Sequence, residues 1–156
     1  MIKILLMCLI ALTGCSQKIS ETGKHYCSNG VLNYRLEVLA GKNKGTGDSA
    51  NSLATDVSLE VQNDGHFTMY YKVNGLPQSM PSIQYKTNGT KLSGSDSEEE
   101  VVTDPSTNKK WIRQRNYELT VDSNSGDVKR TITENHMDIN KSLSSTESYI
   151  LNANCK

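Results

Sequence analysis

Alternation of apolar and polar side chains at every second residue is the feature that most constrains the fold of this 156-residue chain. The pattern runs from His25 towards the C-terminus in short segments separated by Gly, Asn and Asp. Such alternation gives a segment one apolar and one solvated face, which is typical of half-buried β-strands. No segment has the period of a convincing amphipathic helix, and no internal repeat is visible. The sequence therefore predicts an all-β fold.

Two hairpins have the clearest signals, because each combines alternating strands with a turn that contains Asp-Gly or Asn-Gly. These dipeptides supply the positive φ that tight hairpin turns require. The first hairpin has strands 57–61 and 67–73 around the turn 63–65, and the second has strands 82–87 and 90–95 around the turn 88–89.

Four further strands complete a small antiparallel meander of about eight strands. They are 32–38, 111–121, 128–134 and 148–155. The intervals between strands lack an apolar pattern. We expect a long surface loop at 41–52, a polar tract at 96–110, a turn at 122–127, and a short helix or a loop at 135–147.

Opposite charges balance in this chain, with 17 Lys and Arg residues against 17 Asp and Glu residues. Nucleic-acid binding needs a basic surface, so a nucleic-acid partner is not expected. Hydrophobic residues make up 35% of the chain, which is a low share, and the length predicts one domain. We therefore expect a thin core that depends on additional stabilisation.

Residues 1–15 have the features of a secretion signal, with Lys3 followed by the apolar run 4–12. The run ends in Leu12-Thr13-Gly14-Cys15, which resembles the lipobox of bacterial lipoprotein precursors. The resemblance implies cleavage before Cys15, a diacylglycerol thioether on Cys15, and acylation of the new amine with a fatty acid such as palmitate. An ordinary signal peptide is the alternative. A membrane-spanning helix is excluded, because it needs roughly 20 apolar residues.

The lipoprotein resemblance also implies how the chain is divided and where it resides. Residues 1–14 would be the signal peptide, 15–24 a lipidated tether, and 25–156 a single β-domain. In the sorting rule of such lipoproteins, a serine after the lipidated cysteine permits transfer to the outer membrane, and Ser16 occupies that position. We therefore expect a lipid-anchored protein at the periplasmic face of the outer membrane, with the membrane as a partner through Cys15.

Under that resemblance the cysteines reduce to one pair, because Cys8 leaves with the signal and Cys15 carries lipid. In an exported protein, Cys27 and Cys155 then predict a disulfide, worth about 5 kcal/mol in the chain-entropy model. Two unpaired buried cysteines are the alternative. The disulfide would join the first and last strands and so favours a closed, lipocalin-like barrel. A β-sandwich is the alternative fold, since a disulfide can also link two sheets.

Arg113 and Arg115 are the least expected residues in the predicted strands. In a regular strand they share a face with Trp111 and Tyr117, so two guanidinium groups would point to the barrel interior or its mouth. Buried arginine must be paired. Trp111, Arg113, Arg115 and Tyr117 therefore form a candidate site for an anionic ligand. Alternatively, the strand begins near Asn116 or contains a bulge, and both arginines point to water.

The remaining reactive groups show no spacing that indicates chemistry. His25, His66 and His136 lie far apart, and no serine or cysteine lies in a nucleophile motif. We therefore expect no catalytic residue, no metal site, no cofactor and no enzymatic activity. The acidic run 96–100 is interpreted as a solvated charge run, with a calcium site or a cationic protein partner as alternatives.

Two functions from different classes remain open. The first is a non-catalytic binding module for another envelope protein, as an inhibitor or an assembly factor. In outline the domain is similar to the membrane-bound inhibitors of C-type lysozyme, although Tyr26-Cys27 lacks their intervening residue and Ser93-Gly94 lacks their following tyrosine. The second is a lipocalin-like carrier of a small ligand, although the Gly-x-Trp opening of lipocalins is missing. Inward tyrosines favour it, namely Tyr34, Tyr71, Tyr117 and Tyr149. A hydrolase is a third alternative.

Overall fold

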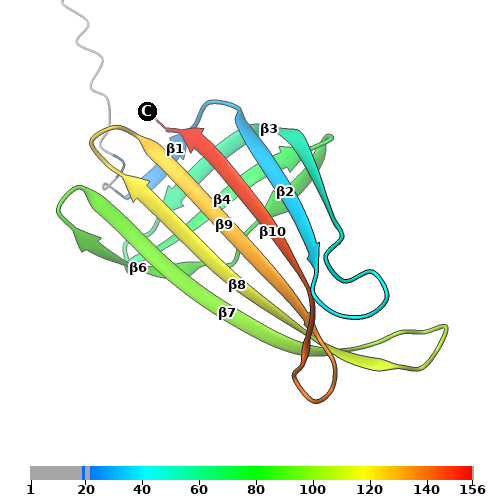
Figure 1. The fold of residues 1–156 in the computed structure, drawn as a ribbon. Coiled ribbons are helices and arrows are strands. Elements are labelled where there is room, and N and C mark those ends of the chain that lie inside the picture. The colour runs from blue at the N-terminus through cyan, green and yellow to red at the C-terminus, as the bar shows by residue number, and fades with distance from the viewer. Residues whose placement is uncertain (1–18, 20–21, 156) are drawn as a thin grey trace, which may run out of the picture.

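The computed structural model describes residue 19 and residues 22–155, and in that part of the chain it is one antiparallel sheet of ten strands without a helix (Figure 1). The strands are β1 (Gly23–Tyr26), β2 (Gly30–Val38), β3 (Gly47–Val61), β4 (His66–Val73), β5 (Leu76–Ser79), β6 (Ile83–Asn88), β7 (Lys91–Thr103), β8 (Lys110–Asp122), β9 (Asp127–Met137) and β10 (Leu143–Asn154). The predicted signal peptide 1–14, the lipidation site Cys15 and most of the tether 15–24 lie outside the described residues.

Eight of the ten strands close into a ring. Each strand pairs with the next in the order β2-β3-β4-β6-β7-β8-β9-β10, and β10 pairs with β2. The short strands β1 and β5 are additions that pair with β3 and β4. The predicted antiparallel meander and its closure are confirmed. Because the sheet is continuous, the alternative of a sandwich of two sheets is wrong.

The pairing of β2 with β10 joins the first and last strands of the ring, over residues 31–38 and 145–152. Cys27 and Cys155 lie at disulfide distance at one end of this pairing, as predicted. The backbone N–H of Cys27 also donates to the carbonyl of Val57 at 2.9 Å. The disulfide therefore fastens the two strands whose pairing closes the ring.

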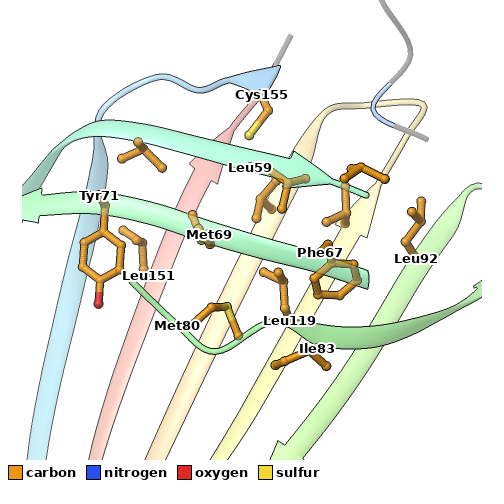
Figure 2. Packing of buried hydrophobic residues seen from close by; sticks show 14 of the residues in the cluster. Leu59, Phe67, Met69, Tyr71, Met80, Ile83, Leu92, Leu119, Leu151 and Cys155 are labelled. Carbon is orange, nitrogen blue, oxygen red and sulfur yellow. The ribbon is translucent and has the colours of Figure 1, made fainter. Parts of the chain in front are cut away.

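The core fills one end of the ring, which we call the closed end (Figure 2). The alternation predicts its inward residues on β3 and β4 correctly. They are Val57, Leu59, Val61, Phe67, Met69 and Tyr71, all buried. The turn between these strands places Gly65 at φ 84°, a conformation that other residues rarely adopt. The Asp-Gly turn thus sets the register that turns both apolar faces inward.

The other end of the ring, which we call the open end, is bounded by strand edges. Among the described residues, β6 pairs with β7 only at residues 91–94 of β7, and beyond them β7 pairs with β8 alone. Likewise, residues 47–53 of β3 pair with β2 alone. The long strands β7, β8, β9, β10 and β2 therefore extend past the short strands β4, β5 and β6 as a concave sheet (Figure 1).

Three polar intervals that the sequence predicts without strands are strands in part and loops in part, and all three lie at the open end. The expected loop 41–52 contains the start of β3, and the polar tract 96–110 contains the second half of β7. In the interval 135–147, β9 extends to Met137 and β10 begins at Leu143, and the residues 138–142 between them form a loop, which is the predicted alternative to a helix. The parts that are strands form through backbone pairing and face no apolar core, so their side chains show no apolar alternation.

The sequence also does not predict β5, which folds back on β4 after the turn Asn74-Gly75. Both turn residues have positive φ, 52° and 77°, which suits a tight hairpin. β5 is an edge strand, where Pro77 can be accommodated because its missing N–H can face away from β4. The β4–β5 hairpin matters because it forms one wall of the candidate site.

Candidate functional site

A cavity of about 530 Å³ lies inside the ring, between the β4–β5 hairpin and the concave face of β8, β9, β10 and β2. Its apolar lining residues are Leu32, Val73, Leu76 and Ile132. Its charged and phenolic lining residues are Tyr71, Arg115, Tyr117, Arg130, Glu134 and Tyr149. Small-molecule sites have volumes of about 300–1,000 Å³ and mixed linings of this kind.

Arg130, on β9, is the unexpected group in this cavity. It is 3% exposed, and its Cζ lies 4.8 Å from the ring centroid of Tyr71. The buried Nε and Nη1 atoms have no hydrogen-bond partner. Burial lowers the pKa of Arg130, and the nearby phenol of Tyr71 opposes that shift. Arginine nonetheless remains charged at neutral pH, and a buried charge without a counter-ion is costly.

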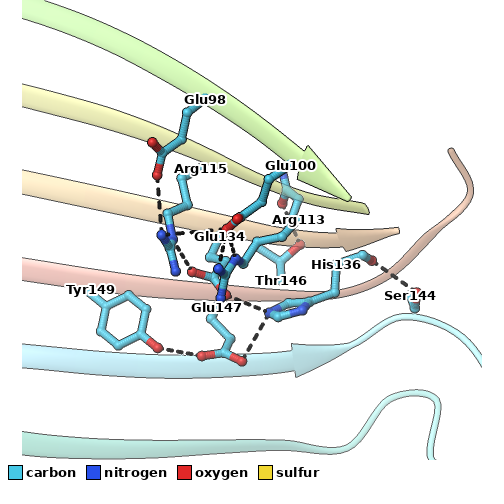
Figure 3. A network of polar contacts seen from close by, with 11 residues as sticks. Glu98, Glu100, Arg113, Arg115, Glu134, His136, Ser144, Thr146, Glu147 and Tyr149 are labelled. Atoms are coloured by element: carbon cyan, nitrogen blue, oxygen red, sulfur yellow. Dashed lines mark hydrogen bonds and ion pairs between the residues drawn. The ribbon is translucent and has the colours of Figure 1, made fainter. Parts of the chain in front are cut away.

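Arg115, on β8, is paired by carboxylates of the same chain (Figure 3). Its Nε donates to Glu134 Oε2 at 2.6 Å, and its Nη1 donates to Glu98 Oε1 at 3.3 Å. The hydrogen bond to Glu134 raises the pKa of Arg115. Glu98 also accepts a hydrogen bond from the Tyr117 hydroxyl at 2.5 Å, which lowers the pKa of Glu98. Arg115 is therefore neutralised within the chain, whereas Arg130 has no ion pair among the described residues.

His136 and two glutamates extend this network towards the open end (Figure 3). The Nε2 atom of His136 lies 3.2 Å from Glu134 Oε1 and 3.3 Å from Glu147 Oε1. The Tyr149 hydroxyl donates to Glu147 Oε2 at 2.5 Å. Trp111 covers the imidazole, with ring centroids 4.7 Å apart. The carboxylates of Glu134 and Glu147 thus each have partners other than Arg130.

The predicted anion site comprises Trp111, Arg113, Arg115 and Tyr117, and the structure places them along one regular strand. β8 pairs with β7 and with β9 without a register shift, so the bulge considered from the sequence is absent. The strand begins at Lys110 and not near Asn116. Arg115 and Tyr117 line the cavity, whereas Arg113 lies nearer the open end and pairs with Glu100. Both predicted arginines are therefore occupied by protein carboxylates.

Sequence reasoning missed Arg130, although the alternation contains the signal that could have found it. Strand 128–134 is predicted from its alternating pattern. When Val128 and Ile132 face inward, Arg130 between them does so too. An arginine flanked by apolar residues on the core face indicates a buried charge more strongly than Arg113 and Arg115 do, because those two lie near the start of their strand.

The acidic run 96–100 is not a simple solvated charge run. Glu98 and Glu100 face inward and pair with the arginines of β8, whereas Glu99 faces outward and lies 3.1 Å from Lys141 Nζ. Of the four predicted inward tyrosines, Tyr71, Tyr117 and Tyr149 line the cavity. Tyr34 does not line it but packs against Tyr149, with ring centroids 5.2 Å apart. Among the described residues, no group of three or more His, Cys, Asp or Glu side chains is arranged to hold a metal ion.

No protein-family model, curated protein or solved structure matches this chain. Among residue 19 and residues 22–155, no helix is long and apolar enough to cross a membrane. The functional assignment therefore depends on the cavity and on the side chains that line it.

Proposed function

We propose that this protein is a non-catalytic carrier that binds a small molecule inside the strand ring. The observation that supports it best is the cavity of about 530 Å³, which combines an apolar wall with converging phenol and guanidinium groups. An apolar surface with a few convergent polar groups is the usual composition of a small-molecule site. The carboxylate at the cavity, Glu134, lies 2.6 Å from Arg115 Nε and 3.2 Å from His136 Nε2, so both of its oxygens have partners within the chain, which supports binding over catalysis.

We further propose that the domain is held at the periplasmic face of the outer membrane through acylated Cys15. The lipobox Leu12-Thr13-Gly14-Cys15 supports this part of the proposal. Two or three acyl chains, at about 0.8 kcal/mol per buried methylene, suffice for stable anchoring. The Cys15→Ala variant is expected to move from the membrane fraction to the soluble periplasmic fraction. Retention of that variant in the membrane would contradict anchoring by lipid.

A second candidate is binding to another envelope protein, and one feature of the outer surface supports it. Tyr26 is 70% exposed and Tyr70 is 38% exposed. Lys24 Nζ lies 5.5 Å from the ring of Tyr26 and 6.0 Å from that of Tyr70. Aromatic side chains are enriched at protein interfaces, so this aromatic pair is the expected contact surface of a protein partner.

Native mass spectrometry of the Cys15→Ala protein, purified from the periplasm, tests both candidates. A retained small-molecule mass supports the carrier, and a co-purified protein supports the second candidate. The variant Val73→Trp, which fills the cavity, is expected to lose the retained mass. Val31→Trp is the matched control, because Val31 lies outside the cavity and is 49% exposed. An empty monomer, or equal retention by both variants, would contradict the carrier proposal.

A further inference from the structure

Arg130 has an unpaired charge in the wall of the cavity. It is 3% exposed, and Nε and Nη1 have no hydrogen-bond partner. The ring of Tyr71, 4.8 Å from Cζ, provides a cation–π contact, which is a partial substitute for an anion. A buried guanidinium normally has a carboxylate or phosphate opposite it. The site therefore lacks one negative charge.

The carboxylates on the concave sheet do not supply that charge. Glu134 accepts from Arg115 at 2.6 Å, Glu98 accepts from Arg115 and Tyr117, and Glu147 accepts from Tyr149. Figure 3 shows Glu134 and Glu98 against Arg115, and Glu147 against Tyr149, so each of these carboxylates has a partner other than Arg130. No carboxylate of the described residues is therefore left for Arg130, and a bound anion would supply the missing charge.

The surrounding charges limit that anion to a single negative charge. Arg115 is already paired, so Arg130 is the one cavity-lining arginine without a carboxylate among the described residues. A dianion would bring a second negative charge close to the carboxyl group of Glu134, which also lines the cavity. A carboxylate has one charge and matches the planar guanidinium in shape.

The other lining residues indicate the body of the ligand. Leu32, Val73 and Ile132 contribute an apolar wall, and Leu76 on the β4–β5 hairpin lines the cavity while 65% exposed. A ligand with an apolar body would cover Leu76 and so remove apolar surface from water. The cavity of about 530 Å³ has room for on the order of 20 non-hydrogen atoms, if each takes roughly the volume of a water molecule.

We infer that the cavity binds an amphipathic monocarboxylate, with its carboxylate on Arg130 and its apolar body against Leu32, Ile132 and Leu76. This inference rests on the proposed carrier function and specifies the ligand of the same site. The carboxylate supplies the counter-ion that Arg130 lacks among the described residues. Tyr71, whose ring centroid lies 4.8 Å from Arg130 Cζ, and Tyr117 line the same cavity, and their phenols contribute to the polar end of the site.

Calorimetric titration of the full-length Cys15→Ala protein with four dodecyl probes tests this inference. The probes are dodecanoate, dodecanol, dodecyl phosphate and dodecyltrimethylammonium, each below its micelle concentration at pH 8. One molecule of dodecanoate is expected to bind per protein, with a dissociation constant at least tenfold lower than that of each of the other three probes. Arg130→Met is expected to weaken dodecanoate at least tenfold and leave dodecanol unchanged. The control Arg35→Met, at an exposed position on β2, is expected to bind as the parent does.

Thermal melting without ligand separates binding from folding. Because Arg130→Met removes a buried unpaired charge, its Tm is expected to equal or exceed that of the parent. A folded variant that binds dodecanoate as tightly as the parent would overturn the role of Arg130. Equal affinity for dodecanol and dodecanoate would contradict an anionic ligand but would leave the carrier proposal intact. Tighter binding of dodecyl phosphate than of dodecanoate would indicate a phosphate ligand in place of a carboxylate. Absence of binding by all four probes, while the purified protein retains another small molecule, would also overturn the monocarboxylate alone.

Discussion

β8 has Leu119 and Val121 inward at the closed end of the ring, and Arg113 and Arg115 at the open end. β9 changes in the same way, from Val128 to Glu134. The alternation is the same along each strand, and the side chains that occupy its inner positions change from apolar to charged. One set of strands thus forms both the core and the polar wall of the cavity.

The difference between the two ends indicates where stability and binding reside. At the closed end, inward residues are fully desolvated, and each buried aliphatic side chain contributes about 1.5–3 kcal/mol. At the open end, ion pairs with a solvated partner, such as Arg113 with Glu100, contribute about 0–1 kcal/mol each, and the less exposed Glu134 is the exception. Residues of the open end can therefore be specialised for a ligand at little cost in folding free energy. Arg130 lies between the two ends and combines deep burial with an unpaired charge.

Removal of the disulfide at the closed end is expected to have the largest effect. The bond closes a loop with a sequence separation of 128 residues, which corresponds to about 5 kcal/mol in the chain-entropy model. Cys27→Ala with Cys155→Ala is expected to lower the free energy of unfolding by about that amount, measured by urea denaturation. A reducing agent is expected to reproduce the loss in the parent protein and to add nothing in the double variant. A loss below about 1 kcal/mol would contradict the stabilising role of this bond.

Matched leucine truncations at the two ends compare their packing directly. Leu119 is fully buried at the closed end, and Leu36 on β2 is half-buried at the open end. Leu119→Ala is expected to cost about 2–5 kcal/mol, because it leaves a cavity in the core. Leu36→Ala is expected to cost about 1 kcal/mol, because its side chain is already partly solvated. Equal losses in urea denaturation would show that the open end contributes to the core as much as the closed end does.

Arginine replacements test the charged network at the open end. Arg115→Met removes the main donor of Glu134, whose side chain is 12% exposed, and is expected to cost about 1–3 kcal/mol. Arg113→Met breaks the pair with Glu100, which is 48% exposed, and is expected to cost about 0–1 kcal/mol. Urea denaturation at pH 7 measures both. A larger loss for Arg113→Met would reverse the ranking that burial predicts.

The smallest expected effect is on the stability at alkaline pH, where the Tyr117 phenol loses its proton. Burial and the hydrogen bond to Glu98 raise the pKa of Tyr117 to about 12. A raised pKa favours the neutral phenol in the folded state, so its contribution is complete below pH about 10 and is lost as the pH rises towards 12. Tyr117→Phe is expected to lower the free energy of unfolding by about 1 kcal/mol at pH 8. Between pH 10 and 11.5 its free energy of unfolding is expected to fall less than that of the parent, measured by urea denaturation. An equal fall of the free energy of unfolding in the two proteins over this pH range would contradict the raised pKa of Tyr117.

Sequence patterns predict strands well where a core enforces the alternation. The hairpin of β3 and β4 and the inward residues Leu59, Phe67 and Met69 follow from period-two alternation and an Asp-Gly turn. The second half of β7 does not show this pattern, because its inward Glu98 and Glu100 face arginines and not apolar side chains. A polar strand such as this half of β7 is held by its pairing with the neighbouring strand, and the sequence of the segment alone does not show which strand that is.

The candidate site, like the strands, could be predicted only in part. Arg115 and Tyr117 follow from their position on a regular strand, and both line the cavity. Which arginine is paired depends on Glu134 and Glu98, which belong to β9 and β7 and reach Arg115 across neighbouring strands. That the predicted Arg115 is neutralised, while Arg130 is not, was therefore outside the reach of sequence reasoning.

The sequence by itself determined the all-β class and the inward faces of the core strands, because alternation and turn chemistry are local properties. It also predicted the pair Cys27 and Cys155, once the resemblance to lipoprotein precursors had set aside the other two of its four cysteines. The tertiary structure decided that the ring is lined with apolar residues at one end and with charges at the other, and that Arg130 has no carboxylate partner among the described residues. The physical reason is that burial and ion pairing depend on which strands lie next to each other. That order is set by closure of the whole sheet, which no single segment specifies.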